Sequence, residues 1–293
     1  MQELIDDFQR DLGTCDDIES ALRIGRPVLS LPYCDSIIRR CWPIFEKRIH
    51  EIAPNRKPES IAILDLSGVF HACWSIDEEE AQAMTLRKIE SLCKFAICNH
   101  FVIAVDSDTS WRKEEYPEYK ATRDRKPASF YELRKRTIDA ASLAYPIASV
   151  DHHEADDVIA SLVFSAKLLR NSVTVISEDK DMWQCLGNGT CIYAHRSDEY
   201  RTDEWLESNH GINVKQVVDY LCITGKDNIP KPSGLGKAFA QDNLGKFGSF
   251  AGIVEAAGQL TEDKRKKLFE FAPKYWQASR LHSLKKHLDV FWS

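Results

Sequence analysis

Ile61-Ala62-Ile63-Leu64-Asp65-Leu66 is a continuous apolar run that carries one acid near its end. A short run without polar alternation is typical of a parallel strand that is buried on both faces. Similar runs follow at residues 101–106, 144–147 and 173–176, of which 144–147 is the weakest. Helical segments lie between them, around residues 79–98, 128–142 and 156–169. This alternation predicts an α/β domain with a largely parallel central sheet flanked by helices.

Acidic residues follow the predicted strands at their carboxyl ends. These residues are Asp65, Asp106, Asp179 and Asp181. A further group, Glu154-Ala155-Asp156-Asp157, begins the helix that continues through Val158 and Ile159. Such a run is by itself an ordinary helix start, where the helix dipole favours acids. Ligands of α/β sheets, however, bind beyond the carboxyl ends of the strands, which is the rim that this helix start faces.

Seven carboxylates at one rim, without matching buried bases, repel one another unless a cation lies between them. Their oxygen ligands suit Mg²⁺ or Mn²⁺ better than zinc. The nine cysteines contain no CxxC pair, and we expect them to be small buried hydrophobic residues of a reducing compartment. No stretch has the length of a membrane span or the pattern of a signal peptide, which favours a cytoplasmic protein.

The chain divides into three regions by composition. Residues 1–58 are predicted to form a helical extension that ends in the linker 54–58, and they carry no recognisable chemistry. Residues 59–203 contain the strand and helix pattern of the α/β core. No strand is predicted after Asp181. Residues 204–293 are predicted to be helical, and residues 276–290 are expected to pack back on the core.

A basic and aromatic segment lies between the second strand and the acidic helix. Basic residues at 112, 113, 120, 123, 125 and 126 alternate there with Trp111, Tyr116 and Tyr119. This mixture suits phosphate contacts combined with base stacking. Acids at 114, 115, 118 and 124 make a solvated, salt-bridged loop an equally open interpretation.

A glycine-containing turn at residues 225–237 suggests a helix–hairpin–helix element. Gly234 and Gly236 would let backbone N–H groups approach a phosphate at the start of the following helix. A plain turn is the alternative, because this signal is weak by itself.

These segments, in this order, resemble the 5′-nuclease family: phage 5′–3′ exonucleases, flap endonucleases and the 5′-nuclease domain of bacterial DNA polymerase I. The matching motifs are Ile63-Leu64-Asp65, Val105-Asp106, Trp111-Arg112-Lys113-Glu114, Tyr116-Pro117-Glu118-Tyr119-Lys120-Ala121-Thr122-Arg123, Glu154-Ala155-Asp156-Asp157, Ser177-Glu178-Asp179-Lys180-Asp181 and Asp227-Asn228-Ile229-Pro230. The resemblance covers roughly residues 59–290, and the Trp-Arg-Lys-Glu form resembles the short phage exonucleases more than the cellular flap endonucleases. It implies the fold of these nucleases, with a helix–three-turn–helix in the C-terminal region.

The resemblance also implies roles for individual residues. For a first metal ion it implies Asp65, Asp106, Glu154 and Asp156, with Asp157 beside them, and for a second ion Asp179, Asp181 and Asp227. It places Arg112, Lys120 and Arg123 near the scissile phosphate and in the gateway that threads a 5′ end. DNA contacts are expected from Tyr119, Arg125, Lys126, Gly234, Gly236 and Lys237, and a K⁺ ion is a further possible ligand of the helix–three-turn–helix.

Three positions depart from the family pattern. Thr224 stands where the family usually carries an aspartate, so the second metal site has lost a carboxylate. Glu178 replaces a glycine and would compensate in part if it turned inward. Lys237-Ala238 follows Gly236 in place of a Pro-Lys pair, which weakens the expected grip on a duplex.

The implied activity is that of a hydrolase of DNA replication or repair. It would cut phosphodiesters at 5′ ends or 5′ flaps by a two-metal mechanism, with ions about 3.5–4 Å apart. DNA is the expected partner, an RNA–DNA hybrid stays open as a substrate, and no protein partner is indicated. Two alternatives remain: a DNA-structure-binding protein without catalysis, and a phosphatase of the haloacid-dehalogenase type, which Asp106-Ser107-Asp108-Thr109-Ser110 resembles.

Overall fold

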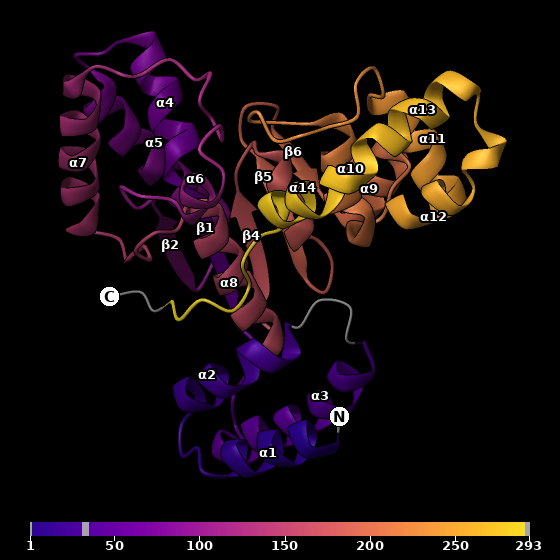
Figure 1. Cartoon of the computed structure of the whole chain (residues 1–293). Helices are drawn as coiled ribbons and strands as arrows, with labels where there is room; N and C mark the ends of the chain where they lie inside the picture. Colours follow the sequence, from indigo (N-terminus) through magenta and orange to yellow (C-terminus); the bar gives the residue numbers. More distant parts are fainter. Residues whose placement is uncertain (1, 31–34, 291–293) are drawn as a thin grey trace.

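The computed structural model describes residues 2–30 and 35–290, and its centre is a six-stranded sheet (Figure 1). The strand order is β3-β2-β1-β4-β5-β6. The strands are β1 (Ser60–Asp65), β2 (His100–Ala104), β3 (Ile147–Ala148), β4 (Ser172–Ile176), β5 (Thr190–Ala194) and β6 (Glu199–Arg201). All neighbouring pairs are parallel except β5 and β6, which are antiparallel. The predicted α/β class and largely parallel sheet are confirmed.

Strand β1 lies at the centre of the sheet and is buried on both faces. Ile61 and Ile63 belong to a core that contains Val158 and Ile159 of helix α8 (Ala155–Leu168). Ala62 and Leu64 point to the opposite core. That core packs against helices α4 (Leu66–Ile76), α5 (Ala81–Ala96) and α7 (Ala128–Ser142). The alternation of side chains along a strand thus explains why an uninterrupted apolar run was required.

The expectation that no strand follows Asp181 is wrong. Strands β5 and β6 extend the sheet beyond β4 and form an antiparallel hairpin. Strand β6 is an edge strand with two charged residues, Glu199 and Arg201, and it is not fully buried. An edge strand of this kind carries no apolar run, so its sequence resembles a loop. Helix α4 also went unpredicted, although Asp65 caps it through the backbone N–H of Ser67.

The C-terminal region is helical, as predicted. Its helices are α9 (Asp203–His210), α10 (Val217–Thr224), α11 (Lys237–Phe247), α12 (Phe250–Glu255), α13 (Glu262–Phe271) and α14 (Tyr275–His282). Residues of α10, α11 and α14 share one hydrophobic core with α8, so this core crosses the predicted boundary at 203–204. The proposed domain limits at 58–59 and 203–204 stay a prediction.

Residues 283–290 run back along α8, which confirms the expected packing of this segment (Figure 1). The backbone N–H of Lys285 donates to Asp157 at 2.9 Å, and the hydroxyl of Ser161 donates to the carbonyl of Lys285 at 2.9 Å. The N–H of Leu288 donates to the same hydroxyl at 3.2 Å. Leu284 and Leu288 complete the core.

Three helices precede the sheet and lie at the far end of α8 in Figure 1: α1 (Gln2–Gly13), α2 (Ile18–Leu29) and α3 (Asp35–Ile52). They enclose their own core, which includes Phe8, Phe45 and also Leu168 of α8. Gly25 of α2 lies so close to Phe45 that a Cβ there would be 2.5 Å from its ring. The helical character predicted for this extension is confirmed.

Two expectations from composition concern the whole chain. Of the eight cysteines that lie in the described ranges, all are free and five are buried, while Cys34 falls outside those ranges. Among the helices of residues 2–30 and 35–290, none has the length and apolar character needed to cross a membrane.

Candidate metal-binding site

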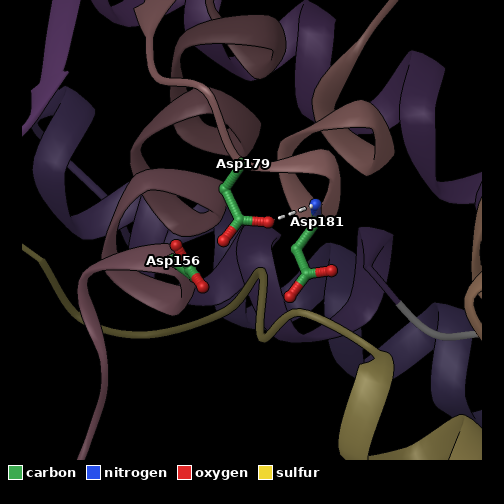
Figure 2. Close-up of side chains that lie close together, drawn as sticks. All are labelled: Asp156, Asp179 and Asp181. Atoms are coloured by element: carbon green, nitrogen blue, oxygen red, sulfur yellow. Dashed lines mark hydrogen bonds between the residues drawn. The ribbon is translucent and has the colours of Figure 1, made fainter. Parts of the chain in front are cut away.

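Three carboxylates converge beyond the carboxyl end of β4. Asp156 lies on the first turn of α8, and Asp179 and Asp181 lie at the start of the short 3₁₀ helix η1 (Lys180–Cys185). Each offers an oxygen atom, and these atoms all lie within 4.8 Å of one another. Figure 2 shows that the three side chains point toward a common space between α8 and η1. The predicted gathering of strand-end and helix-start acids is therefore present here.

Hydrogen bonds hold Asp179 and the nearby Asp65 in place. Asp179 caps η1 by accepting the N–H of Asp181 at 2.9 Å, the bond drawn in Figure 2. Asp65 accepts the N–H of Ser67 at 3.1 Å and the hydroxyl of Ser177 at 2.9 Å. Because each bond involves a residue next to a strand end, the local chain path itself orients the carboxylates.

Asp106 is oriented in a similar way. It accepts the N–H of Ala155 at 2.8 Å and the hydroxyl of Ser67, so it joins the ends of β2 and β1 to the start of α8. The guanidinium of Arg134 lies 3.4 Å from the same carboxylate. Ser67, Ser177 and Arg134 were not predicted as parts of the site, since nothing in their spacing distinguishes them.

The acids destabilise one another's charged forms. Burial, together with the nearby charge of Asp106, raises the pKa of Asp65 to about 6. Burial raises the pKa of Asp181 to about 6 as well. Burial and repulsion from Asp179, Asp65 and Asp181 raise the pKa of Asp156 well above its usual value. A cation placed among these groups would relieve the repulsion.

The chemistry of Asp65, Asp156 and Asp181 fits a hard divalent ion. Asp181 is 9% exposed, and its Oδ1 atom is buried with no hydrogen-bond partner among the described residues. A buried, unpaired carboxylate oxygen is costly unless a cation contacts it. The available donors are all carboxylate oxygens, as Mg²⁺ or Mn²⁺ would require. Asp156 and Asp181 belong to the group whose oxygens lie within 4.8 Å of one another, and we propose that they would hold such an ion together with Asp65, whose charge acts on Asp156.

Metal binding should weaken as the pH falls through about 6. Asp65 and Asp181 have pKa values raised to about 6, so both are ionised near neutral pH and protonated at lower pH. Between pH about 7.5 and about 5, we expect the Mn²⁺ affinity to fall at least about tenfold, because protons compete for the same oxygens. Calorimetric titrations at the two pH values would measure this. Equal affinities would show that these carboxylates keep ordinary pKa values or do not contact the ion.

Arg112 and Asp157 form a buried ion pair behind the acids. Arg112 is 3% exposed, and its two terminal nitrogens lie 2.7 and 2.8 Å from the oxygens of Asp157. Asp157, with no exposed surface, also accepts Trp111 Nε1 at 2.8 Å and the N–H of Lys285 at 2.9 Å. Both side chains thus have partners inside the protein, and the roles expected of them, Arg112 near the scissile phosphate and Asp157 beside the first metal site, stay predictions.

Glu154, three residues before Asp157, is contacted by the side chains of three other residues. Tyr119 donates its hydroxyl at 2.9 Å, Arg112 lies at 3.2 Å, and the ammonium of Lys120 contacts the other oxygen. Tyr119 is only 5% exposed and its hydroxyl bonds to Glu154, so its expected contact with DNA stays a prediction that this arrangement does not support. Lys120 keeps about a quarter of its side chain exposed, on the edge of the acidic site.

The segment around Lys120 packs against the turn that contains Asp227. The N–H of Lys120 donates to the carbonyl of Asp227 at 3.0 Å, and Arg123 Nε donates to the carboxylate of Asp227 at 3.0 Å. Both Lys120 and Asp227 have positive φ, 55° and 54°. Asp227, predicted as a ligand of the second ion, is therefore paired with a cation of the protein. Arg123 remains 56% exposed on its outer side.

The remaining predicted DNA-contact residues lie farther out. Arg125 is exposed, and Lys126 lies 5.8 Å from the centre of the Phe130 ring. Gly236 precedes the first turn of α11, where Lys237 is exposed, and Gly234 adopts a φ of 71° that favours glycine. The structure leaves these positions accessible, and their contact with DNA stays a prediction.

Lys226 is a prominent part of the site that the sequence interpretation missed. Its Nζ lies 2.6 Å from each oxygen of Asp179 and 3.0 Å from Asp181 Oδ2. Burial opposes the charge of Lys226, but Asp181 and Asp179 outweigh this effect and raise its pKa.

Glu178 does not compensate for the carboxylate that is missing at Thr224, because the Glu178 side chain points to another partner and accepts the N–H of Arg196 at 2.7 Å.

Comparisons with known proteins agree with this geometry. Residues 76–211 match the family described as "5′-3′ exonuclease, N-terminal resolvase-like domain". Flap endonuclease Xni of Shewanella pealeana is 32% identical over 181 residues, which is 60% of this chain and 70% of that protein. DNA polymerase I of Borreliella burgdorferi is 30% identical over 202 residues, 65% of this chain but 22% of the polymerase. The chain thus spans about a fifth of the polymerase relatives that it matches.

Solved structures show the same fold at low sequence identity. The phage T5 5′-exonuclease with bound divalent metal ions (zinc) superposes with a TM-score of 0.68 and 19% identity, covering 77% of this chain and 90% of that one. The catalytic core of Rad2 in complex with a DNA substrate has a TM-score of 0.54 and 17% identity, covering 81% and 82%. With the sequence relatives, the strand order and the acids at the strand ends, these likenesses lead to one conclusion: the chain belongs to the 5′-nuclease family.

Proposed function

We propose that this protein is a divalent-metal-dependent nuclease that hydrolyses phosphodiesters of DNA at 5′ ends or 5′ flaps. The observation that carries the proposal is the convergence of Asp156, Asp179 and Asp181 at the rim of a 5′-nuclease fold. The names of the relatives, flap endonuclease and DNA polymerase I, support the same reaction. Mg²⁺ or Mn²⁺ is the proposed cofactor, since all the available donors are carboxylate oxygens.

The acidic side chains would hold the ion, and the basic ones would face the phosphate. Asp156 and Asp181, with Asp65, would hold a divalent ion, which would supply Lewis-acid activation of water and charge stabilisation. Glu154 fixes the position of Lys120, whose ammonium contacts it at the edge of the site. A cation held in place in this way stabilises the charge that develops on a phosphate during attack.

Lys120→Ala should slow cleavage while DNA binding changes little. We expect the cleavage rate to fall by about 10²–10³, because one preorganised cation near the phosphate is lost. Single-turnover cleavage and binding in Ca²⁺ measure the two effects separately. Lys113→Ala, at an exposed position on the same segment, is the matched control and should cleave at the normal rate. A normal rate for Lys120→Ala would remove this residue from the reaction.

The outer basic residues suit the path of a DNA strand. Arg125 and Lys126 extend the positive surface beyond Arg123, and Lys237 begins α11 next to the glycine-containing turn. A phosphate at the start of α11 would be favoured by the free N–H groups and by the helix dipole. We propose that this region binds the duplex part of the substrate. A K⁺ ion there, an RNA–DNA hybrid as substrate and a cytoplasmic location remain predictions.

A panel of labelled substrates tests the proposal. Blunt duplex, nicked duplex, 5′ flap and RNA–DNA hybrid would each be incubated with Mg²⁺, Mn²⁺ or EDTA. We expect cleavage near 5′ ends with either metal and none in EDTA. If DNA binds but no substrate is cleaved, the alternative of a non-catalytic DNA-binding protein is correct.

The phosphatase alternative does not agree with the geometry around Asp106. A haloacid-dehalogenase-type enzyme would need Asp106 free to attack a phosphate. The carboxylate of Asp106 instead accepts the N–H of Ala155 and the hydroxyl of Ser67. We propose instead that Asp106 serves the metal site, the role that the resemblance to the 5′-nuclease family implies for it.

A further inference from the structure

Lys226 lies between two carboxylates that the family resemblance assigns to a second metal ion. Its Nζ is 2.6 Å from both oxygens of Asp179 and 3.0 Å from Asp181 Oδ2. The lysine side chain is 27% exposed, so most of it is enclosed together with the acids. The ammonium therefore contacts three of the four oxygens of these two carboxylates, and only Asp181 Oδ1 lacks a hydrogen-bond partner in the described residues.

We propose that the ammonium of Lys226 replaces the second divalent ion, so that this protein binds one such ion and carries a fixed cation in place of the other. The single ion would be held by Asp156 and by Asp181 Oδ1, which has no hydrogen-bond partner among the described residues, with Asp65 as the neighbouring acid. This inference rests on the proposed function, because it concerns the metal content of that same site.

The other residues implied for a second ion are also engaged. Thr224 is not an acid, and its hydroxyl donates to the carbonyl of Tyr220 at 2.8 Å within α10. Asp227 accepts Arg123 Nε at 3.0 Å. While Lys226 occupies Asp179 and Asp181, the ligand set for a second ion is therefore incomplete, and removal of the ammonium would free these two carboxylates.

Displacing Lys226 would be costly. A second ion at Asp179 and Asp181 would have to remove the ammonium from both carboxylates and leave a largely enclosed charge without a partner. The turn also limits where Lys226 can move. Gly225, with a φ of 74°, ends α10 just before Lys226, and a Cβ at Gly225 would lie 2.1 Å from Lys231 Cδ. This tight turn directs Lys226 into the site.

The replacement changes the chemistry of the site. An ammonium neutralises part of the charge of Asp179 and Asp181 but offers no coordination position for water or for a phosphate oxygen. All metal-bound chemistry would then depend on one ion. The dependence of cleavage on the Mg²⁺ concentration should therefore follow a simple hyperbola, without the steeper rise expected for two ions.

Counting bound Mn²⁺ without DNA tests this inference directly. Calorimetry and electron paramagnetic resonance would follow Mn²⁺ binding to the wild-type protein and to Lys226→Met, Lys226→Gln and Lys226→Arg. We expect one ion for wild type and for Lys226→Arg, which keeps the charge. Lys226→Met and Lys226→Gln should bind a second ion at least about tenfold more tightly than wild type, because the competing charge is gone.

Lys231→Met is the matched control. Lys231 lies in the same turn, is exposed, and its Nζ is 3.3 Å from the carbonyl of Thr224 rather than from the acids. It should bind one ion, as wild type does. Lys226→Gln is included because it retains hydrogen bonding to the acids, and far-UV circular dichroism would confirm that each variant is folded.

Two results would overturn the inference: two ions of similar affinity in the wild-type protein, or one ion in both uncharged variants at position 226. The ion count requires no cleavage. A protein that binds one ion but cuts no substrate would refute the proposed function and leave the role of Lys226 standing. A protein that cuts DNA with two bound ions would support the proposed function and refute the role inferred for Lys226.

Discussion

Asp156→Asn is expected to abolish cleavage while leaving the fold intact. Asp156 lies within the group of oxygens that includes Asp179 and Asp181, and the amide that replaces it has the same shape but no charge. Loss of one charged metal ligand should reduce the cleavage rate by at least about a thousandfold. Binding of a 5′-flap DNA in the absence of metal should stay near the wild-type level, because the basic residues are unchanged.

The same substitution should make the metal-free protein more stable. Burial and three neighbouring acids raise the pKa of Asp156, which means that its ionised form costs free energy in the folded state. A neutral asparagine removes that repulsion near neutral pH, so urea unfolding in EDTA should show a gain in stability over wild type. With saturating Mg²⁺ the order should reverse, since only wild type is stabilised by the ion.

Asp124→Asn is the control for both measurements. Asp124 is exposed in the basic segment, away from the acidic group, and its substitution should alter neither cleavage nor unfolding. If Asp156→Asn retained near-normal turnover, the assignment of Asp156 as a metal ligand would be wrong. If it lost activity through unfolding, the EDTA measurement would reveal a loss of stability.

Arg112→Ala should cause the largest loss of stability of the substitutions considered. The guanidinium makes two bonds to Asp157, a third to Glu154, and a fourth from Nε to the carbonyl of Leu281 at 2.8 Å. Removing it leaves Asp157 as a fully buried charge without its partner. Breaking a buried pair in this way costs about 3–5 kcal/mol, which urea or guanidinium unfolding would measure.

The comparison with a surface pair makes this test specific. Arg10→Ala removes the pair with Asp7, in which both side chains are about half exposed or more, and should cost less than about 1 kcal/mol. Arg112→Lys keeps the charge but cannot bind both oxygens of Asp157, so an intermediate loss is expected. A large fall in cleavage with unchanged stability would instead support the prediction that Arg112 acts near the scissile phosphate.

The sheet was predictable because buried strands require apolar runs. The run at 61–66 supplies side chains to both cores, and the acids that follow it lie at the rim where the sequence placed them. Strand β6 escaped prediction because an edge strand needs no such run. Burial of a strand on both faces requires an apolar run, which explains why β1 could be predicted and β6 could not.

Which charged residues are buried in ion pairs and which reach the acidic site was less predictable. Arg112 and Lys120 belong to one basic segment, yet one is buried against Asp157 and the other reaches the edge of the site. This difference depends on which side chains the fold brings beside them, over distances of more than thirty residues. Lys226 was overlooked for the same reason, because its acidic partners lie 45 and 47 residues away along the chain.

The contact between α2 and the segment 283–290 has a consequence for the order of assembly during synthesis. Arg26 donates to the carbonyl of Leu288 at 2.8 Å and to Asp289 at 2.6 Å, across 262 and 263 residues of sequence. Contacts this distant form late, since the long loop between them must close first. Helix α2 is synthesised well before this segment, so these bonds of Arg26 must wait until residues 288 and 289 have emerged, whereas the contact of the N-terminal core with Leu168 can form earlier.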